Sequence, residues 1–299
     1  MNEQPQFEPG STAAIEPEAQ PVRPFWRFLI ATIYCVVANW IAVSLAFATL
    51  SRHPLVADAA YRLLGCVLLV AGFHFMLRIF DVVDENHAQA LGLPLNRTAV
   101  RQALLGFGIG AVLILMAVGA IAVYGELTVS VQVSAHTLRL GFEVFLLLAF
   151  GAMLEELMFR GYPFQRLAES IGSAGAILVF SALFGAVHLW NPNAGGFLSW
   201  GFFNTIAVGV LFAVAYLRTG SLWLPFGMHF AWNFFLGVVF GLPVSGLRDF
   251  SVIVRTIASG PRILTGGGYG IEASLTGAVV ILLGFVPVIV LTRKQPQRI

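Results

Sequence analysis

The sequence predicts an all-α protein, a polytopic membrane helical bundle with about eight transmembrane helices. Of its 299 residues, 58% are hydrophobic and only 11% are charged, whereas soluble domains carry about 25% charged residues. The mean hydropathy is +0.84, and long apolar runs recur along the chain. The formal net charge of +2 is too small to indicate a nucleic-acid partner, so we expect none.

The apolar runs define the elements, because a helix needs about 20 apolar residues to cross a bilayer. Eight segments reach or approach this length: 25–50, 57–80, 101–124, 139–162, 174–190, 198–217, 221–240 and 273–292. We divide the chain into a disordered N-terminal tail (1–24), N-terminal transmembrane helices (25–138), a catalytic core (139–240), a long loop (241–272), and a last transmembrane helix with the C-terminal tail (273–299). The tail is rich in Pro, Glu and Gln, a composition typical of disorder.

An even number of spans places both termini on the same side of the membrane. Most Lys and Arg residues then fall on the side of the termini, which the positive-inside rule assigns to the cytoplasm. We therefore expect a multi-pass integral protein of a bacterial inner membrane, with cytoplasmic N- and C-termini. Its expected partners are membrane lipid and a peptide or protein that reaches the bilayer, and the sequence leaves its oligomeric state open.

Three ionisable residues, Glu155, Glu156 and Arg160, lie together near the end of the apolar segment 139–162. Charges inside a hydrocarbon layer are costly and usually mark a function or a buried pair. Glu156 and Arg160 are four residues apart and share a helix face, the spacing of an ion pair. Glu155 is rotated from Glu156 by about 100° and has no local partner, so we expect it to be available for chemistry.

Two histidines and an asparagine lie in the following apolar segments. A turn near Gly172 would pair 139–162 with 174–190 as antiparallel helices. Glu156 and His188 lie at equal sequence distances from Gly172, so such a hairpin brings them to the same depth. His229 and Asn233 are four apart on one face of segment 221–240. The sequence thus predicts that these side chains converge within the bilayer.

This set of side chains suits hydrolysis by water in two ways. Glu155, His188 and His229 are the residue types of a zinc site with an open water position. Without a metal, Glu155 and His188 could deprotonate water, while His229 and Asn233 donate hydrogen bonds to an oxyanion. Both alternatives, zinc and no metal, stay open. The sequence contains neither a Gly-x-Ser-x-Gly nor a His-Glu-x-x-His motif, so attack by water remains.

Three short motifs resemble those of the CPBP family, also called Abi, which contains type II CAAX prenyl endopeptidases and bacteriocin-processing or immunity membrane proteins. The motifs are Glu155-Glu156-x-x-x-Arg160, Phe184-x-x-x-His188 and His229-x-x-x-Asn233. They occur in order, each on a predicted membrane helix. The resemblance covers roughly residues 140–240.

The resemblance implies a CAAX-protease-like intramembrane endopeptidase, of metallo- or glutamate type. It implies that Glu155 is the base and that His188 positions the water. It further implies that His229 and Asn233 stabilise the oxyanion. Glu156 and Arg160 would orient the site. A non-catalytic immunity or adaptor protein of the same fold is the alternative, and a transporter with a proton relay is a third. The resemblance leaves open whether a substrate is prenylated.

Overall fold

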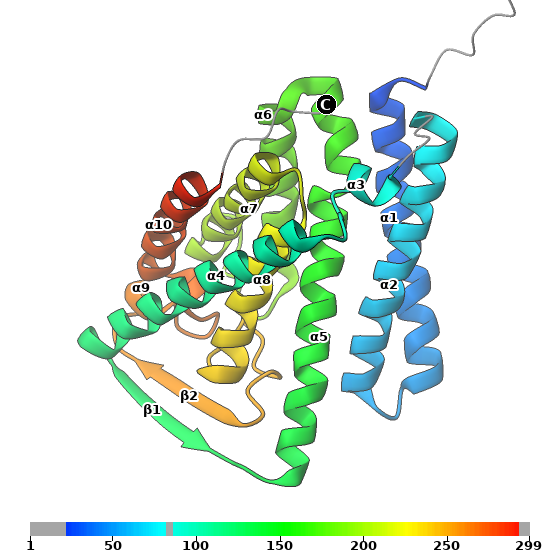
Figure 1. Ribbon diagram of the computed structural model, residues 1–299. Helices are drawn as coiled ribbons and strands as arrows, with labels where there is room; N and C mark the ends of the chain where they lie inside the picture. Colours follow the sequence, from blue (N-terminus) through cyan, green and yellow to red (C-terminus); the bar gives the residue numbers. More distant parts are fainter. Residues whose placement is uncertain (1–21, 82–85, 293–299) are drawn as a thin grey trace, which may run out of the picture.

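The computed structural model describes residues 22–81 and 86–292, and helices dominate it (Figure 1). The tail predicted for residues 1–24 and the end of the C-terminal tail, 293–299, lie almost wholly outside these residues. The longer helices are α1 (Pro24–Leu50), α2 (Pro54–Met76), α4 (Arg97–Tyr124), α5 (Ala135–Arg160), α6 (Tyr162–Val187), α7 (Trp200–Thr219), α8 (Trp223–Phe234) and α10 (Leu275–Leu291). Shorter helical segments are η1 (Leu77–Asp81), α3 (His87–Ala90), η2 (His188–Trp190), η3 (Phe235–Val239), α9 (Arg262–Thr265) and η4 (Ile271–Ala273).

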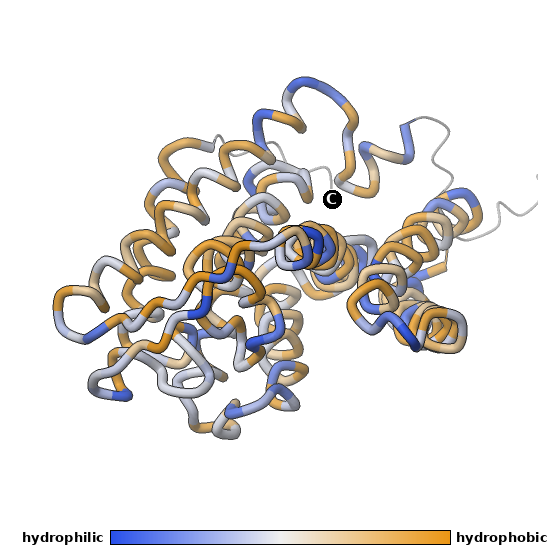
Figure 2. Tube along the Cα trace, turned by 90° about the horizontal axis from the view of Figure 1, so that it is seen from below, coloured by the Kyte–Doolittle hydropathy of each residue, from blue (hydrophilic) through white to orange (hydrophobic). Residues whose placement is uncertain are grey.

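The predicted all-α membrane bundle is confirmed, but the predicted number of eight spans is not. Five helical stretches are long and apolar enough to cross a membrane, and one of them, Ala135–Trp190, contains both α5 and α6. The helices α8 and α10 have only 12 and 17 residues, which is short for a bilayer of about 30 Å. Hydrophobic residues predominate along the helices, and hydrophilic residues gather in the connections (Figure 2).

A stripe of small residues joins α1 to the rest of the bundle. Its buried members are Ala31, Cys35, Ala38, Ala42 and Ala46, at spacings of three or four residues. Small side chains let helix backbones approach closely in a membrane, where lipid provides no hydrophobic drive for association. The helix α1 packs against α2 and α6, so these three form one side of the molecule.

Glycines bring α4 and α8 into close contact. A Cβ atom on Gly106 or Gly110 of α4 would collide with the backbone of α8 at Leu224 or Met228, and a Cβ on Gly227 would collide with α4. This spacing of Gly106 and Gly110 is that of a Gly-x-x-x-Gly helix contact. It holds the short α8, and with it His229 and Asn233, in the centre of the bundle.

The predicted turn near Gly172 is present. Gly172 has φ 82° and ψ 157° inside α6, a conformation that glycine adopts far more readily than other residues. An additional break separates α5 from α6 at Gly161, two residues before Pro163. The chain therefore rises along α5, turns at Gly172, and descends along the rest of α6 to His188 (Figure 1).

An antiparallel ribbon closes one end of the bundle. The strands β1 (Glu126–Val131) and β2 (Val254–Ser259) pair from Glu126 opposite Ser259 to Val131 opposite Val254. The segment 241–272, predicted to be a long loop, thus contains β2, α9 and η4. The start of α1 and the end of α10 lie at the opposite end of the molecule from the ribbon (Figure 1). This agrees with termini on a common side, while the cytoplasmic orientation stays a prediction.

Candidate active site

The predicted ion pair of Glu156 and Arg160 forms the floor of the site. Nη1 of Arg160 donates to Oε1 of Glu156 over 3.2 Å, and Nη2 donates to the Gly209 carbonyl on α7 over 3.2 Å. Both charged side chains are buried. The guanidinium also lies over the Phe184 ring, 4.6 Å from its centroid. One buried pair therefore ties α5 to α6 and α7.

His229 on α8 joins this pair. Its Nδ1 lies 2.9 Å from Oε1 of Glu156, and its Nε2 lies 3.7 Å from Oε2 of Glu155. The ring stacks on Phe212 of α7, with centroids 5.2 Å apart. The sequence prediction assigned Glu156 to Arg160 alone, whereas the structure gives the carboxylate two cationic or donor partners. The imidazole is therefore fixed between both glutamates.

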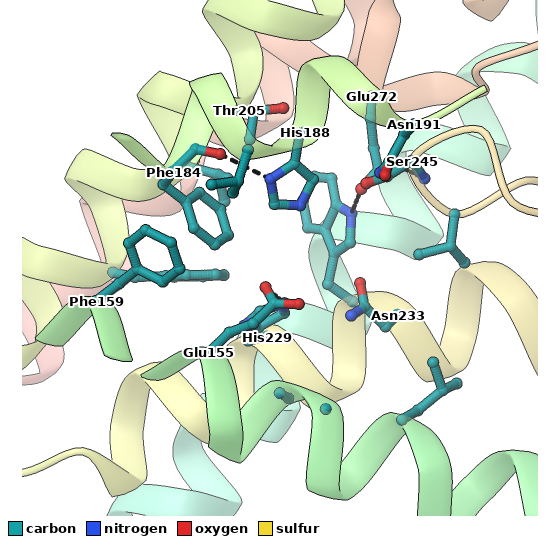
Figure 3. Close-up of a pocket in the computed structure, with 18 of the residues that line it drawn as sticks. Glu155, Phe159, Phe184, His188, Asn191, Thr205, His229, Asn233, Ser245 and Glu272 are labelled. Carbon is teal, nitrogen blue, oxygen red and sulfur yellow. Dashed lines mark hydrogen bonds and ion pairs between the residues drawn. The ribbon is translucent and has the colours of Figure 1, made fainter. Parts of the chain in front are cut away.

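Glu155 differs from Glu156 in its surroundings, as the sequence predicted. Its side chain is 30% exposed and that of Glu156 is 0% exposed, although the two residues are adjacent in α5. Within the described part of the chain, Oε2 of Glu155 makes no hydrogen bond. Figure 3 shows its carboxylate pointing into a cavity that His188 faces from the other side. A carboxylate in this position is free to accept a proton from a bound water.

The ring of His188 is held by its own helix. Its Nδ1 lies 2.7 Å from the backbone oxygen of Phe184. A carbonyl oxygen only accepts, so Nδ1 carries the proton and Nε2 of the neutral ring is an acceptor. The motif residue Phe184 thus has two roles, since its carbonyl oxygen orients His188 and its ring covers Arg160.

The predicted residues meet at one cavity of about 360 Å³ (Figure 3). Glu155, His188, His229 and Asn233 line it, while Glu156 and Arg160 lie behind its wall. Asn233 of α8 lines the cavity together with Glu155, and Figure 3 labels both side chains. The convergence predicted from the sequence is therefore present, and the chemical roles of these residues stay predictions.

The cavity also contains polar residues that the sequence prediction missed. Glu272 of η4 accepts a hydrogen bond from Nε1 of Trp232 over 3.1 Å and another from the backbone N–H of Ser245. Burial is the main cause that raises the pKa of Glu272 above its usual value. Asn191, Asn204, Thr205 and Arg62 line the cavity as well. Arg62 could have been found, because it is a charged residue within the predicted second span.

The candidate metal ligands do not assemble into a metal site. Among the described residues, no three His, Cys, Asp or Glu side chains are arranged to hold a metal ion. Glu155, His188 and His229 line the same cavity, with Nδ1 of both histidines engaged and Nε2 of His229 facing Glu155. The roles below are assigned to these side chains alone, without a metal.

Comparison with known families connects this geometry to a class of proteins. Residues 137–235 match the family model described as Type II CAAX prenyl endopeptidase Rce1-like. By this match the segment is similar to the CPBP family of CAAX proteases. The predicted resemblance is confirmed over about a third of the chain. No curated protein and no solved structure matched the chain.

The CAAX protease segment contains every predicted site residue from Glu155 to Asn233. It ends before Ser245 and Glu272, which complete the wall of the cavity from the C-terminal side. It also begins after Arg62, which reaches the cavity from α2. The family match thus indicates a protease, and the elements outside it shape the space in which a substrate would lie.

Proposed function

We propose that the protein is an intramembrane endopeptidase in which Glu155 activates a water molecule for attack on a peptide bond. The observation that carries this proposal is the Glu155 carboxylate, which lines the cavity and whose Oε2 makes no hydrogen bond to the described residues, with Nε2 of His229 3.7 Å away. Its neighbour Glu156 is fully buried and occupied by Arg160 and His229. Only one of the two acids is therefore free to exchange a proton.

The protons can be followed through the reaction. Water lies between Glu155 and Nε2 of His188, both of which are acceptors, and its oxygen attacks the carbonyl carbon as its proton passes to Glu155. The C–N bond then breaks, and Glu155 returns the proton to the amine that leaves. The products are a carboxylic acid, which keeps the second proton of the water until it ionises in solvent, and an amine, and Glu155 ends in its starting state.

The negative oxygen formed on attack needs hydrogen-bond donors. The Asn233 amide supplies one donor. His229 donates from Nε2 only when both of its ring nitrogens are protonated, because Nδ1–H is used by Glu156. The two ring nitrogens of His229 each face a glutamate, Nδ1 at 2.9 Å from Glu156 and Nε2 at 3.7 Å from Glu155, and these contacts support a ring that donates from both nitrogens.

The test is cleavage of a peptide library by the purified protein in lipid vesicles, with products identified by mass spectrometry. Glu155→Gln preserves the size of the side chain and removes the base, so we expect cleavage to fall by about 10²- to 10⁴-fold. His188→Ala should show a comparable loss. Glu143→Gln is the matched control, since Glu143 lies on the same helix and pairs with Arg139 away from the cavity.

The outcomes separate the functions. Loss of cleavage in both site variants, with the control unaffected, would support the endopeptidase. Unchanged cleavage by Glu155→Gln and His188→Ala would overturn it. A cellular function that survives Glu155→Gln in a folded protein would instead favour the immunity or adaptor alternative.

A further inference from the structure

Glu272 is a carboxylate in the wall of the active-site cavity, and the proposed chemistry does not use it. Its Oε1 accepts a hydrogen bond from Nε1 of Trp232 over 3.1 Å, and its Oε2 accepts one from the backbone N–H of Ser245. Both donors are neutral. The titratable side chains near it are His188 and Tyr269, and no arginine or lysine among the described residues pairs with it.

Other acidic residues of the membrane helices are compensated by an arginine. Asp58, Glu143, Glu156 and Glu169 each pair with an arginine three or four residues away on the same helix, at 2.7 to 3.3 Å. A carboxylate that is buried without a cation is costly, and burial accordingly raises the pKa of Glu272. A cation that a ligand brings into the cavity would offset this cost.

The side chains around Glu272 offer acceptors rather than donors. Nδ2 of Asn204 already donates to the backbone oxygens of Glu272 over 2.9 Å and of Ser274 over 2.8 Å, so Oδ1 is left as an acceptor. The Thr205 hydroxyl donates to the Gly201 carbonyl over 2.7 Å, and its oxygen can still accept. Asn204 and Thr205 line the cavity together with Glu272. This wall suits a group that only donates, as ammonium and guanidinium groups do.

Glu272 also lies close to the groups that the proposed reaction uses. Its partner Trp232 directly precedes Asn233 on α8, and His188 interacts with it electrostatically. Figure 3 shows Glu272 across the cavity from Glu155. Lysine and arginine carry their charge at the end of a long, flexible stem. Such a side chain can therefore extend towards Glu272 from a residue beside the bond that is cleaved.

We infer that Glu272 binds a lysine or arginine side chain of the substrate beside the scissile bond, and so directs cleavage to basic peptides. The inference rests on the proposed endopeptidase function and names its substrate class. A neutral side chain of the same length would leave the carboxylate buried without a cation, so the site should discriminate strongly. Glu272 lies outside residues 137–235, so this preference comes from elements beyond the segment that matches the family model.

The experiment takes one peptide that the wild type cleaves and varies the residue on each side of the cleaved bond among lysine, methionine and glutamate, above neutral pH. At one of these positions, we expect lysine to exceed methionine by about 10- to 100-fold in kcat/KM, since hydrogen bonds to charged groups are of this strength. Glu272→Gln should abolish this ratio, and Glu272→Lys should favour glutamate at the same position. Glu143→Gln, which removes a carboxylate paired with Arg139 outside the cavity, should keep the ratio.

A wild-type measurement covers the case in which the Glu272 variants do not fold. Cleavage of a random peptide library, with the new termini read by mass spectrometry, should show lysine and arginine enriched at one fixed position beside the bond. Equal cleavage of the lysine and methionine peptides, or no such enrichment, would overturn the inference and leave the endopeptidase intact. A lysine preference that persists in Glu272→Gln, or an equal loss on all peptides in that variant, would overturn it too. A wild type that cleaves no peptide would refute the proposed function and this inference with it.

Discussion

The buried pair of Glu156 and Arg160 leads to a quantitative prediction about stability. In Glu156→Ala, Nη1 of Arg160 loses its 3.2 Å hydrogen bond and His229 loses its 2.9 Å contact. Arg160 is 1% exposed, so water cannot replace the lost partner. Breaking a buried pair in this way costs about 3–5 kcal/mol, because one charge remains buried without compensation.

This cost should be visible in thermal unfolding of the purified protein in detergent micelles. For a chain of this size, about 3–5 kcal/mol corresponds to a fall of about 6–20 °C in Tm. The double variant Glu156→Ala with Arg160→Met removes both charges and should recover part of the loss, giving strong non-additivity. Glu143→Ala breaks the Arg139–Glu143 pair, whose arginine is largely exposed, and should cost less than about 1 kcal/mol.

Two results would refute this reasoning. The first is a Glu156→Ala protein whose Tm falls no further than that of Glu143→Ala. The second is simple additivity of the Glu156→Ala and Arg160→Met effects, because residues that compensate each other's charge must couple. Either result would mean that the pair does not hold α5, α6 and α7 together.

Three further predictions concern packing, pH and metal. Gly110→Ala should destabilise the protein by about 1–3 kcal/mol, because its Cβ would lie 2.5 Å from the Met228 carbonyl oxygen. Gly108→Ala is the control, since no atom lies within 4 Å of its Cβ, and it should be neutral or stabilising. Thermal unfolding of both variants measures the difference. Burial raises the pKa of Glu272, so the folded state favours its protonated form, and the resulting stability is present below about pH 4.5 and lost as the pH rises through the raised pKa. Unfolding midpoints over a pH series should therefore show the wild type losing stability relative to Glu272→Gln, and a pH-independent difference would contradict this. Dialysis against a chelator should leave peptide cleavage unchanged, because no three His, Cys, Asp or Glu side chains among the described residues are arranged to hold a metal ion. A loss of cleavage that added zinc restores would contradict the metal-free mechanism.

The geometry of the site was predictable where it depends on local spacing. Glu156 and Arg160 are one turn apart, so their ion pair follows from helix geometry. The turn at Gly172 placed His188 at the depth of Glu155. The contact of His229 with Glu156 joins residues 73 positions apart, and no spacing rule predicts it. Glu272 was missed for the same reason, because it reaches the cavity through the packing of a distant loop.

The fold was predictable to a similar extent. Long apolar runs identify membrane helices because the bilayer demands them. The runs do not identify the ribbon of β1 and β2, because its two strands are separated in the chain by the helices α5, α6, α7 and α8. The predicted number of eight spans is not confirmed, since α8 and α10 are apolar but short, and α8 packs closely on α4 through glycines such as Gly106.

The most direct test of the central claim is a single turnover in ¹⁸O-labelled water, with the oxygen isotopes of the product measured by mass spectrometry. Attack by a water that Glu155 activates predicts one ¹⁸O atom in the new carboxylate of the first product molecule formed. Attack by the Glu155 carboxylate itself would release the amine and form an anhydride, and its hydrolysis at the Glu155 carbonyl would give an unlabelled first product and leave the label on the protein. That second result would contradict the proposed role of Glu155.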